Sequence, residues 1–133
     1  MPLLRLFTSL ARKSIPESFP LILCKTVADT LGKPLARCDV AIIPDCIMTL
    51  GGVSSQPQAQ VYLTSIGSQS EVENAKHCSK LSTLVSENLK IPLGCIGIQF
   101  TEVKSHEVGR GGKIYTKIIA ETPPSGVMSK FVC

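Results

Sequence analysis

Two stretches of the sequence, LGKPLARCDVAIIP at residues 31–44 and LKIPLGCIGIQFTE at residues 89–102, decide the fold because they share one pattern. Each begins with a leucine, continues after two residues with Pro-Leu, and ends in an alternating apolar run. Pro92 follows Pro34 at the same distance along the chain as Leu89 follows Leu31. The same offset pairs Leu23 with Leu81, Val27 with Val85, Val40 with Ile98, and Ile42 with Phe100. These matches indicate a duplicated unit.

Each copy of the unit predicts a strand, a helix and a second strand. In the first copy, strands are expected at residues 3–8 and 38–43, and Ser18 is suited to cap the helix between them. Gly32 stops that helix and Pro34 prevents its return. In the second copy, strands are expected at residues 58–66 and 96–101, and Ser70 with Glu73 forms a capping-box pattern. Apolar residues at helical spacing mark the two helices: Phe19, Ile22, Leu23, Thr26 and Val27 in the first, and Cys78, Leu81, Val85 and Leu89 in the second.

Two consecutive right-handed βαβ units predict an α/β (α+β) fold, with a four-stranded mixed sheet and two antiparallel helices on one face. We expect residues 1–116 to form a single domain of two pseudo-repeats, about 1–57 and 58–116, followed by a loose tail at residues 117–133. A sheet covered on one side leaves its other face bare. Residues expected to make that bare face apolar, and so to drive self-association, are Val40, Ile42, Ile98 and Phe100.

The segment at residues 107–115 has a glycine-rich centre, GRGGK, that imitates a phosphate-binding loop. It lacks the G-x-x-x-x-G-K-[ST] spacing, and no strand-to-helix turn is expected after it. Clustered glycines between patterned segments are typical of turns. We therefore expect a hairpin or an edge-strand turn, with turn geometry as the role of Gly109, Gly111 and Gly112.

The composition limits the classes of partner. The chain of 133 residues carries a formal net charge of +4, and it has no tryptophan, two tyrosines and four phenylalanines. Nucleic-acid binding through stacked aromatic side chains on a basic face therefore has little support. No run approaches the roughly 18 consecutive apolar residues of a membrane span. The first ten residues lack signal-peptide features, so we expect a cytoplasmic protein, with any secretion independent of a signal peptide.

The six cysteines show no C-x-x-C pair and no regular spacing. In a chain without a recognisable signal peptide, this pattern favours reduced, mostly buried thiols over disulfides. Zinc sites need about four ligands with paired spacing, and His77 and His106 stand apart from any cysteine pair. We expect neither a metal site nor a cofactor.

Pro2 directly follows the initiator methionine in MPLLRLFTSL, and two interpretations are open. Proline has no N–H group to give a sheet, so the start of a strand is one of few places where it fits. Alternatively, removal of Met1 turns the Pro2 nitrogen into a terminal secondary amine. Apolar burial and a nearby cation both lower the pKa of an amine, which suits a general base. Leu3 and Ile66 could supply apolar walls and Lys33 the cation, although a lysine at a helix end is also an ordinary solvated group.

Several fragments in order resemble the macrophage migration inhibitory factor family, which includes D-dopachrome tautomerase and belongs to the tautomerase superfamily. They are Pro2 at the start, LGKP at residues 31–34, IIPD at 42–45, MTLGG at 48–52, TSIG at 64–67 and EVG at 107–109. The resemblance covers Met1 to about Tyr115. It implies the same duplicated βαβ fold, assembled as a homotrimer with sites between subunits.

The resemblance also implies a keto–enol tautomerase that acts on a small 2-oxo acid or an aromatic enol or keto compound. Pro2 would be the catalytic base after Met1 is removed, Lys33 would hold the substrate carboxylate, and the backbone N–H of Ile66 would assist it. Gln99 matches a polar side chain that a neighbouring subunit contributes. Positions that match the pocket wall are Leu3, Pro34, Arg37, Gly97, Val108, Arg110 and Tyr115.

The chain departs from the family pattern at four of these positions. Gly97 and Gln99 stand where the family has a tyrosine and an asparagine, and Arg110 and Arg37 stand where mammalian members have a tryptophan and a tyrosine. These changes predict a more open and more cationic site, although exposed loop arginines are also ordinary. The family's C-x-x-C, linked to thiol redox activity, is absent at residues 56–61. The departures leave open an alternative function, a cytokine-like ligand of a cell-surface receptor with weak or vestigial tautomerase activity.

Overall fold

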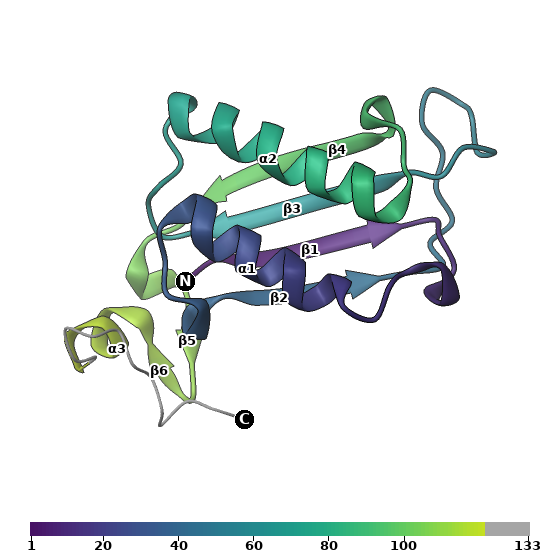
Figure 1. Ribbon diagram of the computed structural model, residues 1–133. Helices are drawn as coiled ribbons and strands as arrows, with labels where there is room; N and C mark the ends of the chain where they lie inside the picture. The colour runs from purple at the N-terminus through teal and green to yellow at the C-terminus, as the bar shows by residue number, and fades with distance from the viewer. Residues whose placement is uncertain (122–133) are drawn as a thin grey trace.

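The structure, a computed structural model, describes residues 1–121 (Figure 1). Its helices and strands follow the predicted order of two strand–helix–strand units, with a hairpin and a third helix added at the end. The elements are β1 (Leu3–Thr8), α1 (Phe19–Leu31), β2 (Asp39–Ile43), β3 (Ala59–Ser65), α2 (Glu71–Leu89), β4 (Ile96–Glu102), β5 (Gly109–Arg110), β6 (Lys113–Ile114) and α3 (Tyr115–Glu121). Short 3-10 turns are η1 (Arg12–Ser14), η2 (Leu35–Arg37), η3 (Leu93–Cys95) and η4 (Ser105–Glu107).

The main sheet has the strand order β2-β1-β3-β4. Strand β1 pairs with β2 in parallel, β3 pairs with β4 in parallel, and the two units meet where β1 and β3 run antiparallel. Helices α1 and α2 lie antiparallel on the same face (Figure 1). The predicted mixed sheet with two helices on one side is therefore confirmed. The chain begins in one of the two central strands, so its amino terminus is surrounded by structure.

The core contains the same positions from both copies of the repeat. Leu23, Val27 and Leu31 of α1 are buried, and so are the matching residues of α2. Both sets pack against the buried side chains of the central strands. The residues in question are Leu81, Val85 and Leu89 on α2, Leu4 and Leu6 on β1, and Val61 and Leu63 on β3.

The prediction of an apolar bare face is wrong, because the residues named for it lie on the helix side. Strand pairing sets Val40 beside Leu4 and Ile42 beside Leu6, and paired residues share one face of a sheet. In the second unit, the pairing of β4 with β3 sets Ile98 beside Val61 and Phe100 beside Leu63. All of these residues, including Ile98 and Phe100, pack partly buried against the core.

The opposite face of the sheet carries polar side chains. Arg5, Tyr62 and Gln99 lie side by side across β1, β3 and β4 and are exposed. Phe7, half-buried, meets Tyr62 edge to face with ring centroids 5.8 Å apart. The apolar-surface argument for self-association therefore does not hold.

The helix ends agree with the sequence signals except at one cap. Ser70 and Glu73 form the predicted capping box, with Glu73 N–H donating to Ser70 Oγ at 3.2 Å. Gly32 ends α1 in the left-handed region at φ 64°, and Lys90 ends α2 at φ 58°. Ser18 precedes α1, as predicted, but its side chain makes no capping hydrogen bond.

The C-terminal segment departs from the prediction of a loose tail. The hairpin is confirmed, since β5 and β6 pair antiparallel, and a Cβ at Gly109 would meet the Lys113 carbonyl oxygen at 2.9 Å. Residues 115–121, however, form helix α3, which buries Tyr115 and Ile118 completely. Helical spacing of these two residues brings them to one face. Residues 122–133 of the expected tail lie outside the described residues.

The described cysteines are free thiols but are not mostly buried, which corrects that expectation. Cys78 is exposed, and Cys24, Cys38, Cys46 and Cys95 are half-buried. Cys133 lies outside the described residues. Within residues 1–121, none of the helices has both the length and the apolar character to span a membrane.

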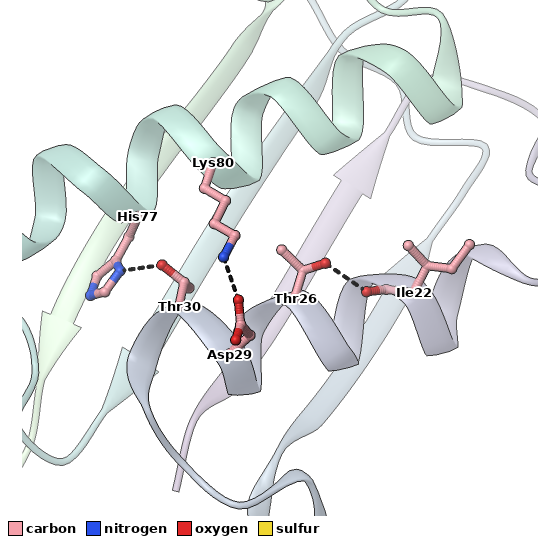
Figure 2. Close-up of polar contacts among 6 residues, drawn as sticks. All are labelled: Ile22, Thr26, Asp29, Thr30, His77 and Lys80. Atoms are coloured by element: carbon pink, nitrogen blue, oxygen red, sulfur yellow. Dashed lines mark hydrogen bonds and ion pairs between the residues drawn. The ribbon is translucent and has the colours of Figure 1, made fainter.

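Two side-chain contacts join α1 to α2, one buried and one exposed (Figure 2). His77 Nδ1 lies 2.9 Å from Thr30 Oγ1, and His77 Nε2 lies 2.7 Å from the Ser68 carbonyl oxygen. Because a carbonyl only accepts, Nε2 carries the hydrogen and Nδ1 accepts from Thr30. Lys80 forms an ion pair with Asp29, whose pKa it lowers through a side-chain hydrogen bond and its charge.

Replacing His77 is expected to cost far more stability than replacing Lys80. His77→Leu removes the buried partner of both Thr30 and the Ser68 carbonyl, which should lower the free energy of unfolding by about 1–3 kcal/mol. Lys80→Ala breaks an exposed ion pair and should change it less. Urea unfolding of both variants and the wild type measures the difference. Equal losses would contradict the structural role assigned to the His77 contacts.

Candidate functional site

The chain's first two residues are buried where β1 begins. The Asp39 N–H donates to the Pro2 carbonyl oxygen at 3.0 Å, which extends the β1–β2 pairing by one residue. Met1, only 4% exposed, forms a buried cluster with Tyr115 and Ile118 of α3. Three partly buried side chains pack against this cluster: Leu3, Ile66 and Val108. The start of the chain is thus held among apolar groups, four of which were predicted as site or pocket residues.

Lys33 and Ile66 meet at the edge of this cluster. The left-handed turn at Gly32 ends α1 and brings Lys33 back toward the sheet. Lys33 Nζ donates to the Ile66 carbonyl oxygen at 3.0 Å. The predicted pair is therefore close in space, with the Ile66 carbonyl rather than its N–H in contact with the lysine.

The surroundings of the amino terminus disfavour a positive charge. Its pKa is lowered from 8.0 to about 6, first by burial and then by the charges of Lys33, Arg37 and Arg110. Cys38 acts in the opposite direction. An amine at this place is mostly neutral at pH 7 and so has a lone pair free to accept a proton.

Arg110 is held beside the same cluster rather than free in a loop. Its Nε donates to Tyr115 Oη at 3.1 Å, and its Nη2 lies 3.3 Å from Asp39 Oδ2. Burial acts to lower the pKa of Arg110, but Tyr115 and Asp39 outweigh it and raise the value. These contacts join the β5–β6 hairpin to α3 and to the start of β2.

Gln99 and Gly97 are not brought to the amino terminus within one chain. Both are exposed on β4, an edge strand, and β3 separates β4 from β1. Pro34, by contrast, directly follows Lys33 and begins the turn η2 that contains Arg37. Of the predicted site residues, the single chain thus brings most to the amino terminus; the two on β4 are not brought there, and Pro34 is placed only by its position next to Lys33.

Two residues at the site were missed by the sequence analysis. Ile118 has a usable signal, its helical spacing from Tyr115, but the prolines at 123 and 124 favoured a loose tail instead. Asp39, which holds Arg110, has no sequence signal, because that contact joins residues distant along the chain.

A separate open groove, of about 870 Å³, lies at the other end of β1 and β2. It follows the carboxyl ends of these strands, whereas Met1 and Pro2 precede β1. Side chains that line it include Arg12, Ile15, Pro20, Ile42 and Pro44. Within residues 1–121, no group of three or more His, Cys, Asp or Glu side chains is placed to hold a metal ion.

Residues 1–116 match the sequence profile of the family described as macrophage migration inhibitory factor (MIF). D-dopachrome decarboxylase-B from Xenopus laevis is 31% identical over 117 residues, which are 87% of this chain and 98% of that protein. Macrophage migration inhibitory factor from Rattus norvegicus is 31% identical over 115 residues, which are 86% of this chain and 99% of that protein.

Solved structures of proteins with the name macrophage migration inhibitory factor share the fold of this chain. The macrophage migration inhibitory factor from Trichinella spiralis superimposes with a TM-score of 0.81 at 28% identity, and covers 84% of this chain and 98% of that one. The protein of the same name from Toxoplasma gondii has a TM-score of 0.74 at 27% identity, over 84% of this chain and 98% of that one.

The charge of Lys33 should be measurable at the amino terminus. Lys33→Gln removes the largest charge effect, so the pKa of the Met1 amine is expected to rise above about 6, while burial keeps it below 8.0. Titration of Met1-retaining protein labelled with methyl-13C methionine follows this group. Lys25→Gln, in the helix α1 that precedes Lys33, is the matched control and should leave the pKa unchanged. An unchanged pKa in Lys33→Gln would refute the arrangement.

Proposed function

The chain belongs to the macrophage migration inhibitory factor family, and on that premise we propose that it is a keto–enol tautomerase of small 2-oxo acids. The general base is the amine of Pro2, which becomes the amino terminus when Met1 is removed. The observation that carries the proposal is the buried setting of the first two residues among apolar groups and cations, which lowers the pKa of the Met1 amine bonded through Met1 to Pro2. Two relatives are named D-dopachrome decarboxylase-B and D-dopachrome decarboxylase, and these names agree with chemistry on small carbonyl compounds.

The proposed reaction moves one proton between two atoms of the substrate. The neutral Pro2 nitrogen takes a proton from C3, next to the 2-oxo group, the C–H electrons form the C2–C3 double bond, and the carbonyl π electrons move to the 2-oxo oxygen. The protonated amine then gives the proton to that oxygen, which completes the enol, and ketonisation runs the same steps in reverse, so nothing is oxidised or reduced. A base whose pKa lies near the working pH is effective in both directions. The proline ring also fixes φ, which aims the nitrogen.

Lys33 is proposed to bind the substrate carboxylate. Its Nζ lies beside the apolar cluster and donates to a neutral carbonyl, that of Ile66. A substrate carboxylate is a charged acceptor. The charge-assisted hydrogen bond from Lys33 to a carboxylate is stronger than one to a neutral carbonyl. Arg37 adds positive charge on the same side.

We infer that the site is completed in a homotrimer. Gln99 and Gly97 lie on an exposed edge strand, where a second copy of the chain can place them against the amino terminus of the first. Gln99 then supplies a hydrogen-bond donor, and Gly97 supplies none. Mass measurement of the native assembly tests the trimer.

Replacing the ring-bound secondary amine of Pro2 by the primary amine of glycine should lower the proposed activity. Pro2→Gly is expected to lower kcat for ketonisation of enol-phenylpyruvate by up to about 10²–10⁴, the usual contribution of a general base, because no ring aims the glycine nitrogen. Intact mass must first verify that Met1 is absent, since in Met1-retaining protein the Pro2 nitrogen is an amide without a basic lone pair. Equal rates in the wild type and Pro2→Gly, both without Met1, would contradict the proposal.

The pH dependence should report the same amine. Because the base acts only when unprotonated, kcat/KM is expected to fall as the pH drops through the pKa of the Pro2 amine and to be level at higher pH. The surroundings that lower the pKa of the adjoining Met1 amine should also bring this midpoint below 8.0. An unperturbed amine would instead give a midpoint near pH 8.0. Lys33→Gln should move the midpoint upward. A rate that falls with rising pH would show that a different group acts as the base.

A role as an extracellular ligand of a cell-surface receptor is the second candidate. Relatives carry the name macrophage migration inhibitory factor. In addition, Gly97 has no side chain at a position where the family resemblance places a pocket tyrosine. The two roles separate cleanly in Pro2→Gly. Receptor binding that survives in this variant, with ketonisation lost, would favour the ligand role; absence of both secretion and receptor binding would remove it.

A further inference from the structure

We propose that the preferred substrates are 2-oxo acids with an unbranched aliphatic side chain, and that the site disfavours an aromatic ring. This inference rests on the proposed function, because it concerns the substrate of the same Pro2 amine. It is carried by the way in which Met1 occupies the site and by the way in which α3 closes it.

Met1 shows which shape the apolar part of the site accepts. It is bonded to the Pro2 nitrogen, so its atoms occupy the space that a substrate beside that nitrogen must use. Its side chain is an unbranched row of two methylenes, a sulfur and a methyl group. Met1 is only 4% exposed, so the surrounding side chains enclose this slender chain almost completely. Removal of Met1 frees a space of that shape.

The other end of Met1 shows where the carboxylate belongs. The Met1 amine lies where the charges of Lys33, Arg37 and Arg110 disfavour a cation, and the same field favours an anion. A 2-oxo acid with its carboxylate at this position directs its side chain along the path of the Met1 side chain. Its C3 then lies beside the Pro2 nitrogen, as proton removal requires.

Helix α3 closes the apolar end of this space. Tyr115 and Ile118 belong to the buried cluster of Met1 and are themselves fully buried. Tyr115 is held at its side chain and at its backbone. Its hydroxyl accepts from Arg110 Nε at 3.1 Å, and its backbone N–H donates to the Val108 carbonyl at 2.9 Å. A phenyl ring is wider than a thioether chain, so it would have to displace one of these packed side chains.

Proton exchange at C3 tests the inference without any change to the protein. Wild-type protein that lacks Met1 is incubated in D2O with 2-oxohexanoate, its branched isomer 4-methyl-2-oxopentanoate, or phenylpyruvate. Loss of the C3–H signal in proton NMR follows removal of the proton by Pro2 and return of a deuteron. Each rate is expressed relative to exchange in buffer alone, since the three acids differ in intrinsic acidity at C3.

The enhancement for 2-oxohexanoate is expected to exceed that for phenylpyruvate by about tenfold or more, the size of effect that a misfitting apolar group has on specificity. The branched acid should lie between them. An equal or larger enhancement for phenylpyruvate would overturn the chain-shape inference and leave the proposed function standing. Exchange that does not exceed buffer with any acid, or that is undiminished in Pro2→Gly, would overturn both.

Two neighbouring isoleucines of α3 make a matched pair of variants. Ile118→Ala should enlarge the closed end and raise the phenylpyruvate-to-2-oxohexanoate ratio by about tenfold. Ile119→Ala removes the same atoms from a side chain that is 43% exposed and should leave the ratio unchanged. Ile118→Val serves if Ile118→Ala fails to fold, with a smaller shift in the same direction. An unchanged ratio in the folded Ile118 variant would refute the role of α3.

Discussion

The amino terminus of this chain begins a central strand, and the rest of the site depends on that constraint. Strand β1 lies between β2 and β3, so the residues before it are covered on both sides. Pro2 accepts a hydrogen bond from Asp39 through its carbonyl and, as a proline, has no backbone N–H to leave unsatisfied in the sheet. The same pairing that builds the fold thus places the terminal amine among the ends of several elements, where loops and side chains can act on it.

Burial has the largest effect on the pKa of that amine, and the three cations add to it. Burial acts first because an amine taken from water loses the hydration of its charged form, whatever its neighbours are. The cations have a second effect that burial lacks, which is to attract an anionic substrate. Lys33 therefore contributes both to the lowered pKa proposed for the Pro2 amine and to the proposed affinity for a carboxylate. Arg110 shares its charge with Asp39, so its stronger effect is to hold Tyr115 in place.

The duplicated helices position the site from the other side. His77 on α2 contacts Thr30, in the last turn of α1 before Lys33 (Figure 2). It also contacts Ser68, in the loop after Ile66. One buried side chain thereby joins the two segments that carry Lys33 and Ile66, the proposed substrate-binding pair. In the sequence, His77 stands out only as a potential metal ligand apart from any cysteine pair, because a hydrogen-bonding role depends on partners that are distant along the chain.

The sequence by itself determined the repeat, the order and bounds of the main elements, the α2 capping box and the motif set around Pro2, since all of these are local patterns. It could not determine which face Val40 and Phe100 occupy, because alternation defines two faces but only pairing with buried neighbours says which is inside. Nor could it find α3, whose few turns are stabilised by burial of Tyr115 and Ile118 rather than by helix propensity. Tertiary structure alone decided that Met1 is buried with Tyr115 and Ile118 of α3, because this result depends on packing between segments that are far apart along the chain.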